Sequence, residues 1–189
     1  MTDPCLKPVL ILLTEGFADW ETGLLAAATT DGLVLRHASP DGSDVSSIGG
    51  MRVTGLETFA PTGDEVVVIC GGTIWERPEA PDIGPALMSA RQNGAPIAAI
   101  CGGVRPIARI GLLDGVRHTS NGREWLAAAV PGYAGAELHE DSPSAVADKG
   151  IVTASGTMPT TFALKVLEAA GFSKEQMGEY RAMLAAELA

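Results

Sequence analysis

Residues 96–103 read PIAAICGG, an apolar run that ends on a cysteine followed directly by two glycines. A run of this length and composition predicts a buried strand, and the glycines, which lack a Cβ atom, predict a sharp break into a helix. A cysteine at this break lies at a helix N-terminus, where unpaired amide N–H groups and the helix dipole lower the pKa of a thiol. Cys101 is therefore a candidate nucleophile. The alternative interpretation is a cysteine that packs in the core as a small apolar residue.

Apolar segments of strand length alternate with helical patterns on both sides of this stretch. This alternation, with continuously apolar strands, predicts an α/β fold with a mainly parallel sheet and helices on both faces. In such folds the functional site lies at the carboxyl ends of the strands. The expected strands are residues 8–13, 33–37, 65–70 and 96–100, and the expected helices are residues 19–30, 82–92 and 101–110. Pro106 should distort the third of these helices.

Two hairpins and two further helices complete the expected fold. Residues 45–60 form an excursion with a hairpin around Gly49-Gly50, and residues 145–155 read as two short strands around the turn at 148–150. Amphipathic patterns predict helices over residues 161–170 and 173–188, the second with Ser173 as its N-cap. These elements extend the α/β pattern to the end of the chain.

The composition limits the class of protein. The chain has 189 residues, enough for a large core, and we expect residues 1–189 to form a single domain. Hydrophobic residues make up 46% of the chain, which fits close packing of helices on a sheet. The three cysteines, Cys5, Cys70 and Cys101, form neither a disulfide framework nor a metal-ligand cluster. We therefore expect no metal, no cofactor and a reducing cytoplasm.

The charge of the chain excludes several partners. A formal net charge of −10 argues against nucleic acid and against an anionic membrane surface, because both require basic patches. The apolar segment 9–13 is too short for the core of a signal peptide and lacks a basic flank, and no run approaches the length of a membrane span. We expect a soluble globular protein whose partner is a small-molecule or peptide substrate.

Five motifs, in order along the chain, carry a resemblance to a known family. They are GFADWE at 16–21, the strand that ends in Gly71-Gly72, the stretch 98–103, LLDG at 112–115 and the hairpin at 145–156. Together they resemble the superfamily of the PfpI intracellular protease and the parkinsonism-associated deglycase, which is related to class I glutamine amidotransferases. The resemblance implies a flavodoxin-like three-layer sandwich that covers nearly the whole chain.

The resemblance also implies roles for individual residues. It places Cys101 at a strained elbow, with Glu21 reaching toward it from the first helix. It also implies an oxyanion hole made by the backbone N–H groups of Gly72 and Gly102. These four residues would form the centre of the site.

Glu21 has two interpretations. Taken alone, a glutamate in the first turn of a helix is a surface charge that complements the helix dipole. In the family pattern this carboxyl is buried beside the cysteine, where burial and a neighbouring thiolate raise its pKa. A protonated Glu21 would then donate a hydrogen bond to the sulfur. Its neighbours Asp19 and Trp20 are interpreted as a helix cap and a packing residue.

The chain departs from the family pattern at the histidine. Protease-type members have a histidine directly after the cysteine, where this chain has Gly102, and deglycase-type members take one from a later strand. Alignment of VRHTSN (116–121) puts Asn121 at that later place. His118 would point to the opposite face and could serve only if the register slips; the alternative is a partly exposed strand histidine. Weaker candidates are His37, beside a turn, and His139, in a polar stretch.

Three functions fit these residues. The preferred one is a cysteine-dependent hydrolase or amidase-like enzyme, with Cys101 attacking a carbonyl and Glu21 as the proton donor. Because no general base is obvious, robust peptidase activity is not expected. The second is a glyoxalase or deglycase that acts on a dicarbonyl through a hemithioacetal. The third is a non-enzymatic peroxide sensor or stress-response protein, because oxidation of cysteine follows its thiolate character. Relatives suggest a homodimer or higher homo-oligomer.

Cys70 is a candidate redox partner. In a flavodoxin-like order its strand neighbours the strand of Cys101, so both cysteines end adjacent strands at the same edge. Cys70 could then capture a Cys101 sulfenate as a disulfide, and the alternative is a buried strand terminus. We also expect Cys101 to be alkylated faster than the other two cysteines, with a pKa below that of a free thiol.

Overall fold

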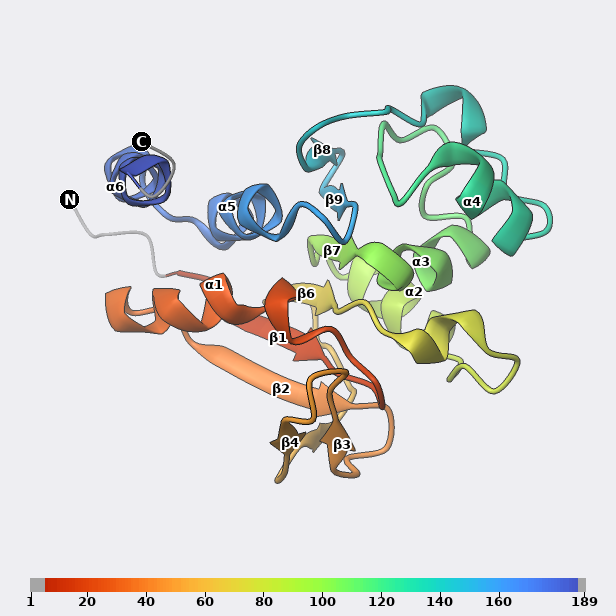
Figure 1. The fold of residues 1–189 in the computed structure, drawn as a ribbon, viewed down its shortest axis with the longest axis horizontal. Helices are drawn as coiled ribbons and strands as arrows, with labels where there is room; N and C mark the ends of the chain where they lie inside the picture. The colour runs from red at the N-terminus through yellow and green to blue at the C-terminus, as the bar shows by residue number, and fades with distance from the viewer. Residues whose placement is uncertain (1–5, 187–189) are drawn as a thin grey trace.

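A seven-stranded sheet forms the centre of the fold (Figure 1). The computed structural model describes residues 6–186. The strands lie in the order β5-β2-β1-β6-β7-β9-β8, and every neighbouring pair is parallel except β8 with β9. Their bounds are β1 (Val9–Leu12), β2 (Leu35–Ser39), β5 (Glu57–Thr58), β6 (Val66–Ile69), β7 (Ile97–Ile100), β8 (Val146–Asp148) and β9 (Ile151–Ala154).

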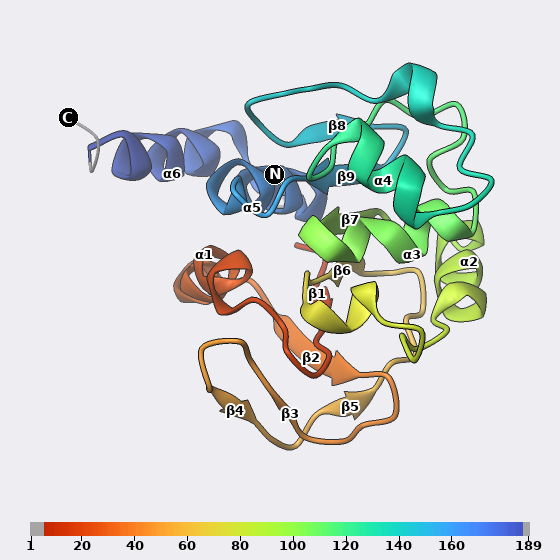
Figure 2. The ribbon, with the colours of Figure 1, turned by 45° about the vertical axis from the view of Figure 1, so that its right-hand side comes forward.

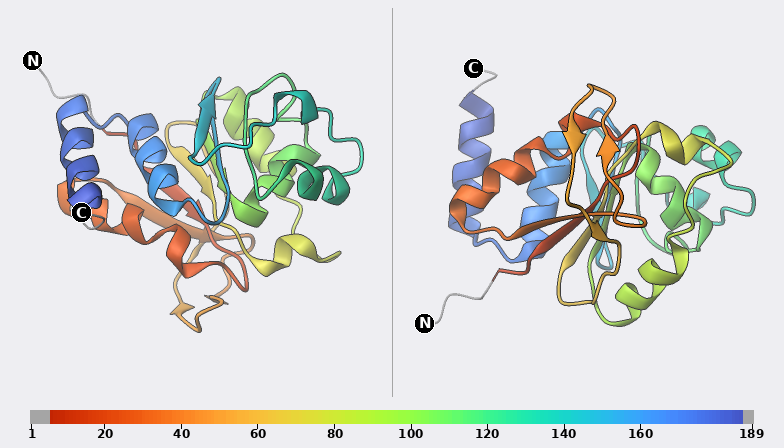
Figure 3. Two further views of the ribbon diagram at one scale, coloured as in Figure 1. Left: turned by 45° about the horizontal axis from the view of Figure 1, so that its top comes forward. Right: turned by 90° about the horizontal axis from the view of Figure 1, so that it is seen from below.

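Helices cover both faces of this sheet. Along β1 the side chains alternate between the two faces, so Val9 and Ile11 pack with Leu25 and Phe162, whereas Leu10 packs on the opposite side. Figures 1 and 3 show the resulting three layers, with the sheet between two groups of helices. One group is α1 (Gly23–Ala27), α5 (Pro159–Ala170) and α6 (Lys174–Ala186); the other is α2 (Gly84–Gln92), α3 (Val104–Arg109) and α4 (Arg123–Ala129).

The register of the central strands brings their carboxyl ends to one edge of the sheet. Leu12 in β1 is level with Ile69 in β6, and Ile69 is level with Ala99 in β7. Ile100 in β7 is in turn level with Ala154 in β9. The loops that follow these strands therefore start side by side, which is where a site is expected in a parallel α/β sheet.

Both expected hairpins are confirmed. The first comprises β3 (Val45–Ser46) and β4 (Arg52–Val53), which flank Gly49-Gly50 and lie beside the β2 edge of the sheet (Figure 2). The second is the antiparallel pair β8 and β9, joined at residues 148–150. Ser173 caps α6 as expected, because its hydroxyl accepts the N–H of Gln176 at 3.2 Å. The expected end of this helix at residue 188 lies outside the described residues.

The helix expected over residues 19–30 is instead three short pieces. They are η1 (Asp19–Glu21), α1 and η2 (Ala28–Asp31), where η denotes a 3₁₀ helix. The hydroxyls of Thr29 and Thr30 bond to carbonyls three residues earlier, at 2.8 and 2.9 Å, and such bonds compete with regular α-helical geometry. The helix after Cys101 also begins with a 3₁₀ turn, η4 (Cys101–Gly103), so Pro106 lies in the first turn of α3, where its missing N–H is tolerated.

Some elements were missed or displaced in the sequence analysis. The second strand lies at β2, two residues later than residues 33–37. The elements β5, α4, η3 (Thr73–Glu76) and η5 (Ala136–Leu138) were not predicted. They have between two and seven residues, which is shorter than the window over which a periodic signal can be recognised. Within the part of the chain that the structure describes, no helix is long and apolar enough to cross a bilayer.

Replacing Gly103 by alanine should destabilise the fold. A Cβ atom there would lie 2.5 Å from the carbonyl oxygen of Ile69 and 3.1 Å from that of Cys70, and both belong to backbone of the central strand or its end. We expect Gly103→Ala to cost about 1 to 3 kcal/mol of unfolding free energy, the range for overpacking. Gly178→Ala in α6, where nothing lies within 4 Å, should stabilise by up to about 1 kcal/mol. Urea unfolding of both variants tests this, and equal midpoints would contradict it.

Candidate active site

Cys101 lies at the carboxyl edge of the sheet, directly after β7. Its φ angle is +55°, in the left-handed region that a residue with a side chain rarely adopts. Strain of this kind is held by the surrounding structure and is frequent at nucleophile positions on strand-to-helix turns. The thiol is partly exposed, and Cys101 lines a small pocket. The structure thus places Cys101 at an elbow, as the sequence predicts.

The carboxyl group of Glu21 is buried next to this thiol. Glu21 is 1% exposed, and its Oε2 accepts the N–H of Gly71 at 2.6 Å. Its Oε1 has no hydrogen-bond partner among the described residues. A Cβ atom on Gly156 would lie 2.8 Å from the Cys101 sulfur and 3.3 Å from this Oε1, so the absence of a side chain at Gly156 leaves room for the pair.

The thiol and the carboxyl shift each other's pKa. Burial raises the pKa of Glu21 to about 7, although the hydrogen bond from Gly71 opposes the shift. Burial also raises the pKa of Cys101, and the negative charge of Glu21 raises it further. The amide N–H of Gly102 and the side chain of Asn121 lower it, but less. A deprotonated Glu21 therefore makes the Cys101 thiolate harder to form.

This result corrects the expectation that the pKa of Cys101 lies below that of a free thiol. The expected contribution of the helix N-terminus is present, because the Gly102 N–H stabilises the thiolate. It comes from a single 3₁₀ turn, and it is outweighed by burial together with a neighbouring carboxylate. Cys5, the other cysteine in the alkylation comparison, lies outside the described residues.

Asn121 is oriented toward Cys101 by three hydrogen bonds. Its side-chain Nδ2 donates to the Cys101 sulfur at 3.3 Å. Its Oδ1 accepts the N–H of Gly156 at 2.9 Å and the hydroxyl of Ser155 at 3.2 Å. The amide therefore presents its N–H to the sulfur and its oxygen to the loop after β9.

Two residues that sequence reasoning missed, Ser155 and Gly156, donate hydrogen bonds to the side-chain oxygen of Asn121 beside Cys101. They follow β9 directly, so the rule that sites lie at strand carboxyl ends could have indicated them. Trp20, interpreted as a packing residue, is instead 51% exposed, and its indole N–H donates to the carbonyl of Gly156 at 3.0 Å. Asp19 is not a helix cap: its Oδ2 accepts the N–H of Gly49 at 2.9 Å and so ties the β3–β4 hairpin to η1.

Gly72 and Gly102 line the same pocket as Cys101. The N–H of Gly72 has no acceptor among the hydrogen bonds of residues 6–186, and the N–H of Gly102 points to the Cys101 sulfur. The pocket has a volume of about 140 Å³, which suits a small substrate. Its lining residues are Ala18, Trp20, Ile48, Gly72, Thr73, Glu76, Cys101 and Gly102.

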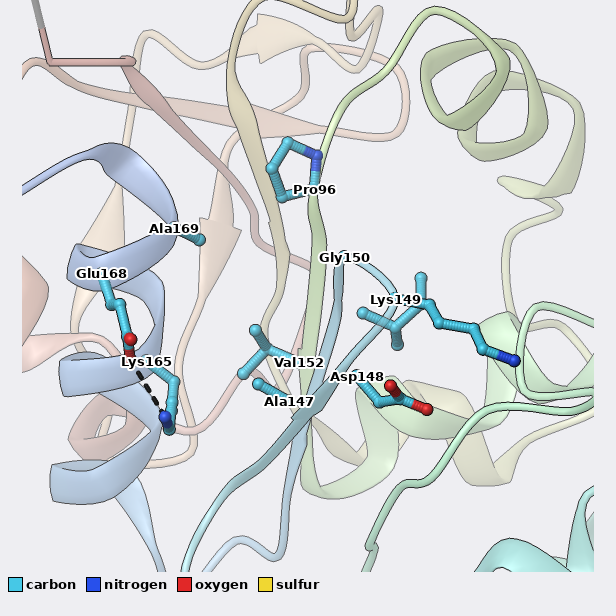
Figure 4. A pocket seen from close by; sticks show the side chains of 10 residues that line it. Pro96, Ala147, Asp148, Lys149, Gly150, Val152, Lys165, Glu168 and Ala169 are labelled. Atoms are coloured by element: carbon cyan, nitrogen blue, oxygen red, sulfur yellow. Dashed lines mark hydrogen bonds and ion pairs between the residues drawn. The ribbon is translucent and has the colours of Figure 1, made fainter. Parts of the chain in front are cut away.

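A larger hollow lies on another part of the molecule and lacks comparable chemistry (Figure 4). It has a volume of about 340 Å³ and lies between α5 and the β8–β9 turn, at the start of β7. Its charged groups are already engaged: Lys165 pairs with Glu168 at 3.0 Å, and Lys149 donates to the carbonyl of Gly115 at 2.7 Å. The candidate site is therefore the smaller pocket at Cys101. Among the described side chains, no group of three or more acidic, histidine or cysteine residues is arranged to hold a metal ion.

His118 does not contribute a ring nitrogen to this site. Its Nδ1 lies 2.7 Å from the carbonyl of Val116, and its Nε2 is hydrogen-bonded to the Tyr133 hydroxyl. Both nitrogens are thus occupied within the core. The alternative interpretation, a partly exposed histidine, is also wrong, because the residue is 0% exposed. The expectation from strand alternation, that His118 points away from Asn121, agrees with these contacts.

Cys70 is buried behind the site. Its thiol has two acceptors within reach of its single proton, the carbonyl of Ala18 at 3.5 Å and Glu21 Oε2 at 3.6 Å. Burial and the charge of Glu21 raise its pKa well above the ordinary value. Cys70 and Cys101 are both free thiols. These features favour a buried strand terminus over a resolving cysteine.

Comparison with known proteins agrees with the fold and with the motifs. Residues 7–169 match the model of the DJ-1/PfpI family. A DJ-1 superfamily protein from Agrobacterium tumefaciens has a similar solved structure, with 36% identity, a TM-score of 0.88, and coverage of 96% of this chain and 100% of that chain. The expected flavodoxin-like α/β fold, with helices on both faces of a mainly parallel sheet, is confirmed.

Two proteins of Bacillus subtilis (strain 168) are also similar in sequence. The chain is 34% identical over 174 residues to the "Uncharacterized protease YdeA", covering 88% of this chain and 85% of that protein. It is 29% identical over 181 residues to the "Uncharacterized protease YoaZ", covering 86% of this chain and 82% of that protein.

Glu21→Gln should make Cys101 more reactive. Glutamine can still accept the N–H of Gly71, but it carries no charge, so the pKa of the Cys101 thiol should fall. We expect the rate of alkylation by iodoacetamide at pH 8 to rise about tenfold, which corresponds to about one pKa unit. Peptide mapping with stopped reaction times measures this rate at each cysteine. Glu175→Gln, an exposed carboxyl in α6, is the control, and an unchanged rate in Glu21→Gln would contradict the coupling.

The same carboxyl should make stability depend on pH. Glu21 loses its proton near pH 4.5 in the unfolded chain but near pH 7 in the folded protein. Between these values the folded protein holds a proton that the unfolded chain has released, so stability should fall as the pH rises through this window. The loss is about 2 to 3 kcal/mol for this group. Urea unfolding at pH 5 and pH 8 measures the difference in unfolding free energy between Glu21→Gln and the unmodified protein. We expect this difference to favour Glu21→Gln more at pH 8 than at pH 5. The same difference at both pH values would contradict the assignment.

Proposed function

The chain belongs to the DJ-1/PfpI family, and on this premise we propose that it is a cysteine-dependent hydrolase or amidase-like enzyme for small carbonyl or amide substrates. The observation that carries the proposal is the strained backbone of Cys101, with φ of +55°, beside a buried carboxyl whose pKa lies at about 7. A carboxyl with this pKa can accept and return a proton near neutral pH. The pair therefore combines a nucleophile with an acid–base group.

The mechanism follows from these contacts. As the Cys101 sulfur attacks the substrate carbonyl, its proton passes to the Glu21 carboxylate and negative charge develops on the carbonyl oxygen. This oxyanion is stabilised by the N–H of Gly72, which has no acceptor among the described residues, and by that of Gly102. Glu21 then protonates the leaving group, and a thioester remains on Cys101. Water hydrolyses the thioester, with Glu21 accepting its proton, and the thiol is restored.

Asn121 takes the place that a histidine would occupy in this mechanism. An amide cannot exchange a proton, so Asn121 holds the sulfur by its Nδ2 hydrogen bond and leaves all proton transfer to Glu21. With one acid–base group and a pocket of about 140 Å³, the site favours small substrates with good leaving groups over peptide bonds. The two Bacillus relatives are named as uncharacterized proteases, which is compatible with acyl transfer but does not identify a substrate for this chain.

Two other functions use the same residues. A reactive dicarbonyl needs no leaving group, so a hemithioacetal on Cys101 with proton transfer by Glu21 would give glyoxalase or deglycase activity. A redox sensor would instead use the protonated Glu21 to hydrogen-bond an oxidised Cys101. The raised pKa of Cys101 reduces the thiolate available to peroxide and to a carbonyl substrate alike, so turnover has to decide between the enzyme and the sensor.

We further propose that the protein acts in a reducing cytoplasm as a homodimer or higher homo-oligomer, with neither nucleic acid nor membrane as a partner. The free thiols of Cys70 and Cys101 support the compartment. Exposed apolar side chains on the β3–β4 hairpin support self-association: Ile48 is 52% and Met51 57% exposed.

Loss of the Cys101 sulfur should abolish turnover. We expect Cys101→Ser to lower kcat/KM for small activated esters, anilides or methylglyoxal by at least about a thousandfold, because the nucleophile is removed. Cys5→Ser removes a different thiol and should leave activity unchanged, and circular dichroism should confirm that both variants fold.

Activity that persists in Cys101→Ser would contradict the proposed nucleophile. The unmodified protein could also turn over none of these substrates and form stoichiometric Cys101 sulfinate with dilute peroxide. That outcome would contradict the enzyme and support the sensor.

A further inference from the structure

A buried polar cluster lies behind Asn121 and has no part in the mechanism above. His139 is 3% exposed, and its Nε2 lies 2.9 Å from the hydroxyl of Ser120, which is 5% exposed. The ring of His118 meets that of His139 edge to face, with centroids 5.5 Å apart. Backbone bonds hold the two segments together, because the N–H of His118 donates to Leu138 and the N–H of Glu140 donates to His118, at 3.2 and 2.7 Å.

The hydroxyl of Ser120 has two possible acceptors for its single proton. One is His139 Nε2 at 2.9 Å, and the other is the carbonyl oxygen of Gly122 at 3.0 Å. The Ser120 oxygen also accepts the N–H of Gly122 at 3.2 Å. When Nε2 carries no proton, the hydroxyl can donate to it. When Nε2 carries a proton, it donates to Ser120, and the hydroxyl proton must turn to Gly122.

The acceptor that the Ser120 hydroxyl bonds affects the turn that carries Asn121. The turn is closed by Ser120 on one side and Gly122 on the other, and Asn121 between them donates to the Cys101 sulfur at 3.3 Å. A change in the hydrogen bonds that close the turn therefore changes the placement of the amide that faces the nucleophile. Among the described residues, no histidine side chain is hydrogen-bonded to Cys101, but His139 is connected to it through the adjacent residues Ser120 and Asn121.

We propose that His139 is a positioning residue for the Cys101 site, acting through the Ser120 hydroxyl on Asn121. The inference rests on the proposed function of Cys101 as the nucleophile. His139 does not touch the reacting atoms. The protonation of His139 selects which of the two hydrogen-bond patterns closes the turn at residues 120–122. The reactivity of Cys101 therefore depends on a buried histidine, although the side chain beside the sulfur is that of Asn121.

Charged groups around His139 set the pH at which the pattern changes. The Nδ1 of His139 has no hydrogen-bond partner among the described residues and lies 3.6 Å from Asp141 Oδ1, which would accept its proton in an ion pair. Burial and the charges of His118 and Arg123 lower the pKa of His139, while Asp141 raises it. Tyr133 and Glu140 face the cluster through His118. The change in pattern is therefore expected below the ordinary histidine value of 6.5.

Ser120, His139 and Asp141 follow the order of a serine nucleophile with its base and orienting acid. The surroundings argue against that role, because Ser120 is buried and does not line the pocket, whereas the Asp141 side chain is 79% exposed. A catalytic triad instead exposes the serine and buries the acid. Labelling of Ser120 by a fluorophosphonate would identify a second nucleophile and overturn the positioning role.

The test is the pH profile of Cys101 alkylation by iodoacetamide, from pH 5 to 8.5, in a Glu21→Gln background that removes the titration of the carboxyl. We expect an inflexion below pH 6.5 with a change in rate of roughly threefold, the size of one altered hydrogen bond. His139→Gln keeps a donor to Ser120 but cannot titrate, and Ser120→Ala breaks the connection, so both should lose the inflexion. His37→Gln, which removes a half-buried histidine in β2, should keep it.

A second measurement separates this inference from the proposed function. The side-chain amide resonance of Asn121, identified by its loss in Asn121→Asp, should shift between pH 5 and 7.5 in the unmodified protein and stay constant in His139→Gln. If Cys101→Ser keeps full turnover but the resonance shifts, the proposed function fails and the positioning of Asn121 by His139 stands. An inflexion and a shift that both persist in folded His139→Gln or Ser120→Ala protein would overturn the role of His139.

Discussion

A buried carboxyl group in contact with a thiol is the constraint around which this site is built. Removing a carboxylate from water is costly, so Glu21 is held by the N–H of Gly71 and has its pKa raised to about 7. The space for the pair exists because Gly71 and Gly156 lack side chains where a Cβ would contact it. The chemistry of Cys101 cannot be described separately from Glu21, because each group sets the charge that the other can carry.

The parallel sheet makes this pairing possible. Cys101, Gly72 and Ser155 follow three strands in register, so residues far apart in sequence begin their loops side by side at one edge. Glu21 arrives from the loop after β1, the fourth strand at that edge. Cores on both faces of the sheet fix these strand ends, which lets a strained φ angle at Cys101 persist. The rigidity of the layers therefore supports the precision of the site.

Among the described residues, no histidine is hydrogen-bonded to the Cys101 sulfur, so the hydrogen bond to the sulfur and the transfer of its proton fall to two different residues. Asn121 supplies a hydrogen bond to the sulfur, and Glu21 supplies the titrating group. The imidazole of His139 is hydrogen-bonded to Ser120, the residue before Asn121. A thiol whose pKa is raised keeps its proton at neutral pH and so resists unspecific modification. In this arrangement the thiol proton of Cys101 can pass to Glu21 when a substrate lies in the pocket and Glu21 is deprotonated.

The sequence by itself determined the order of strands and helices, the elbow at Cys101, both hairpins and the family, because apolar runs, glycine pairs and turn residues act locally along the chain. It also indicated Glu21, Asn121, Gly72 and Gly102, but only through the resemblance of its motifs to a known family. Short elements such as β5 and α4 gave no periodic signal. The direction of the thiol pKa, the contact of Trp20 with Gly156 and the pairing of Ser120 with His139 were decided only by the tertiary structure. Burial and through-space charge depend on which distant segments meet, and no local pattern records that.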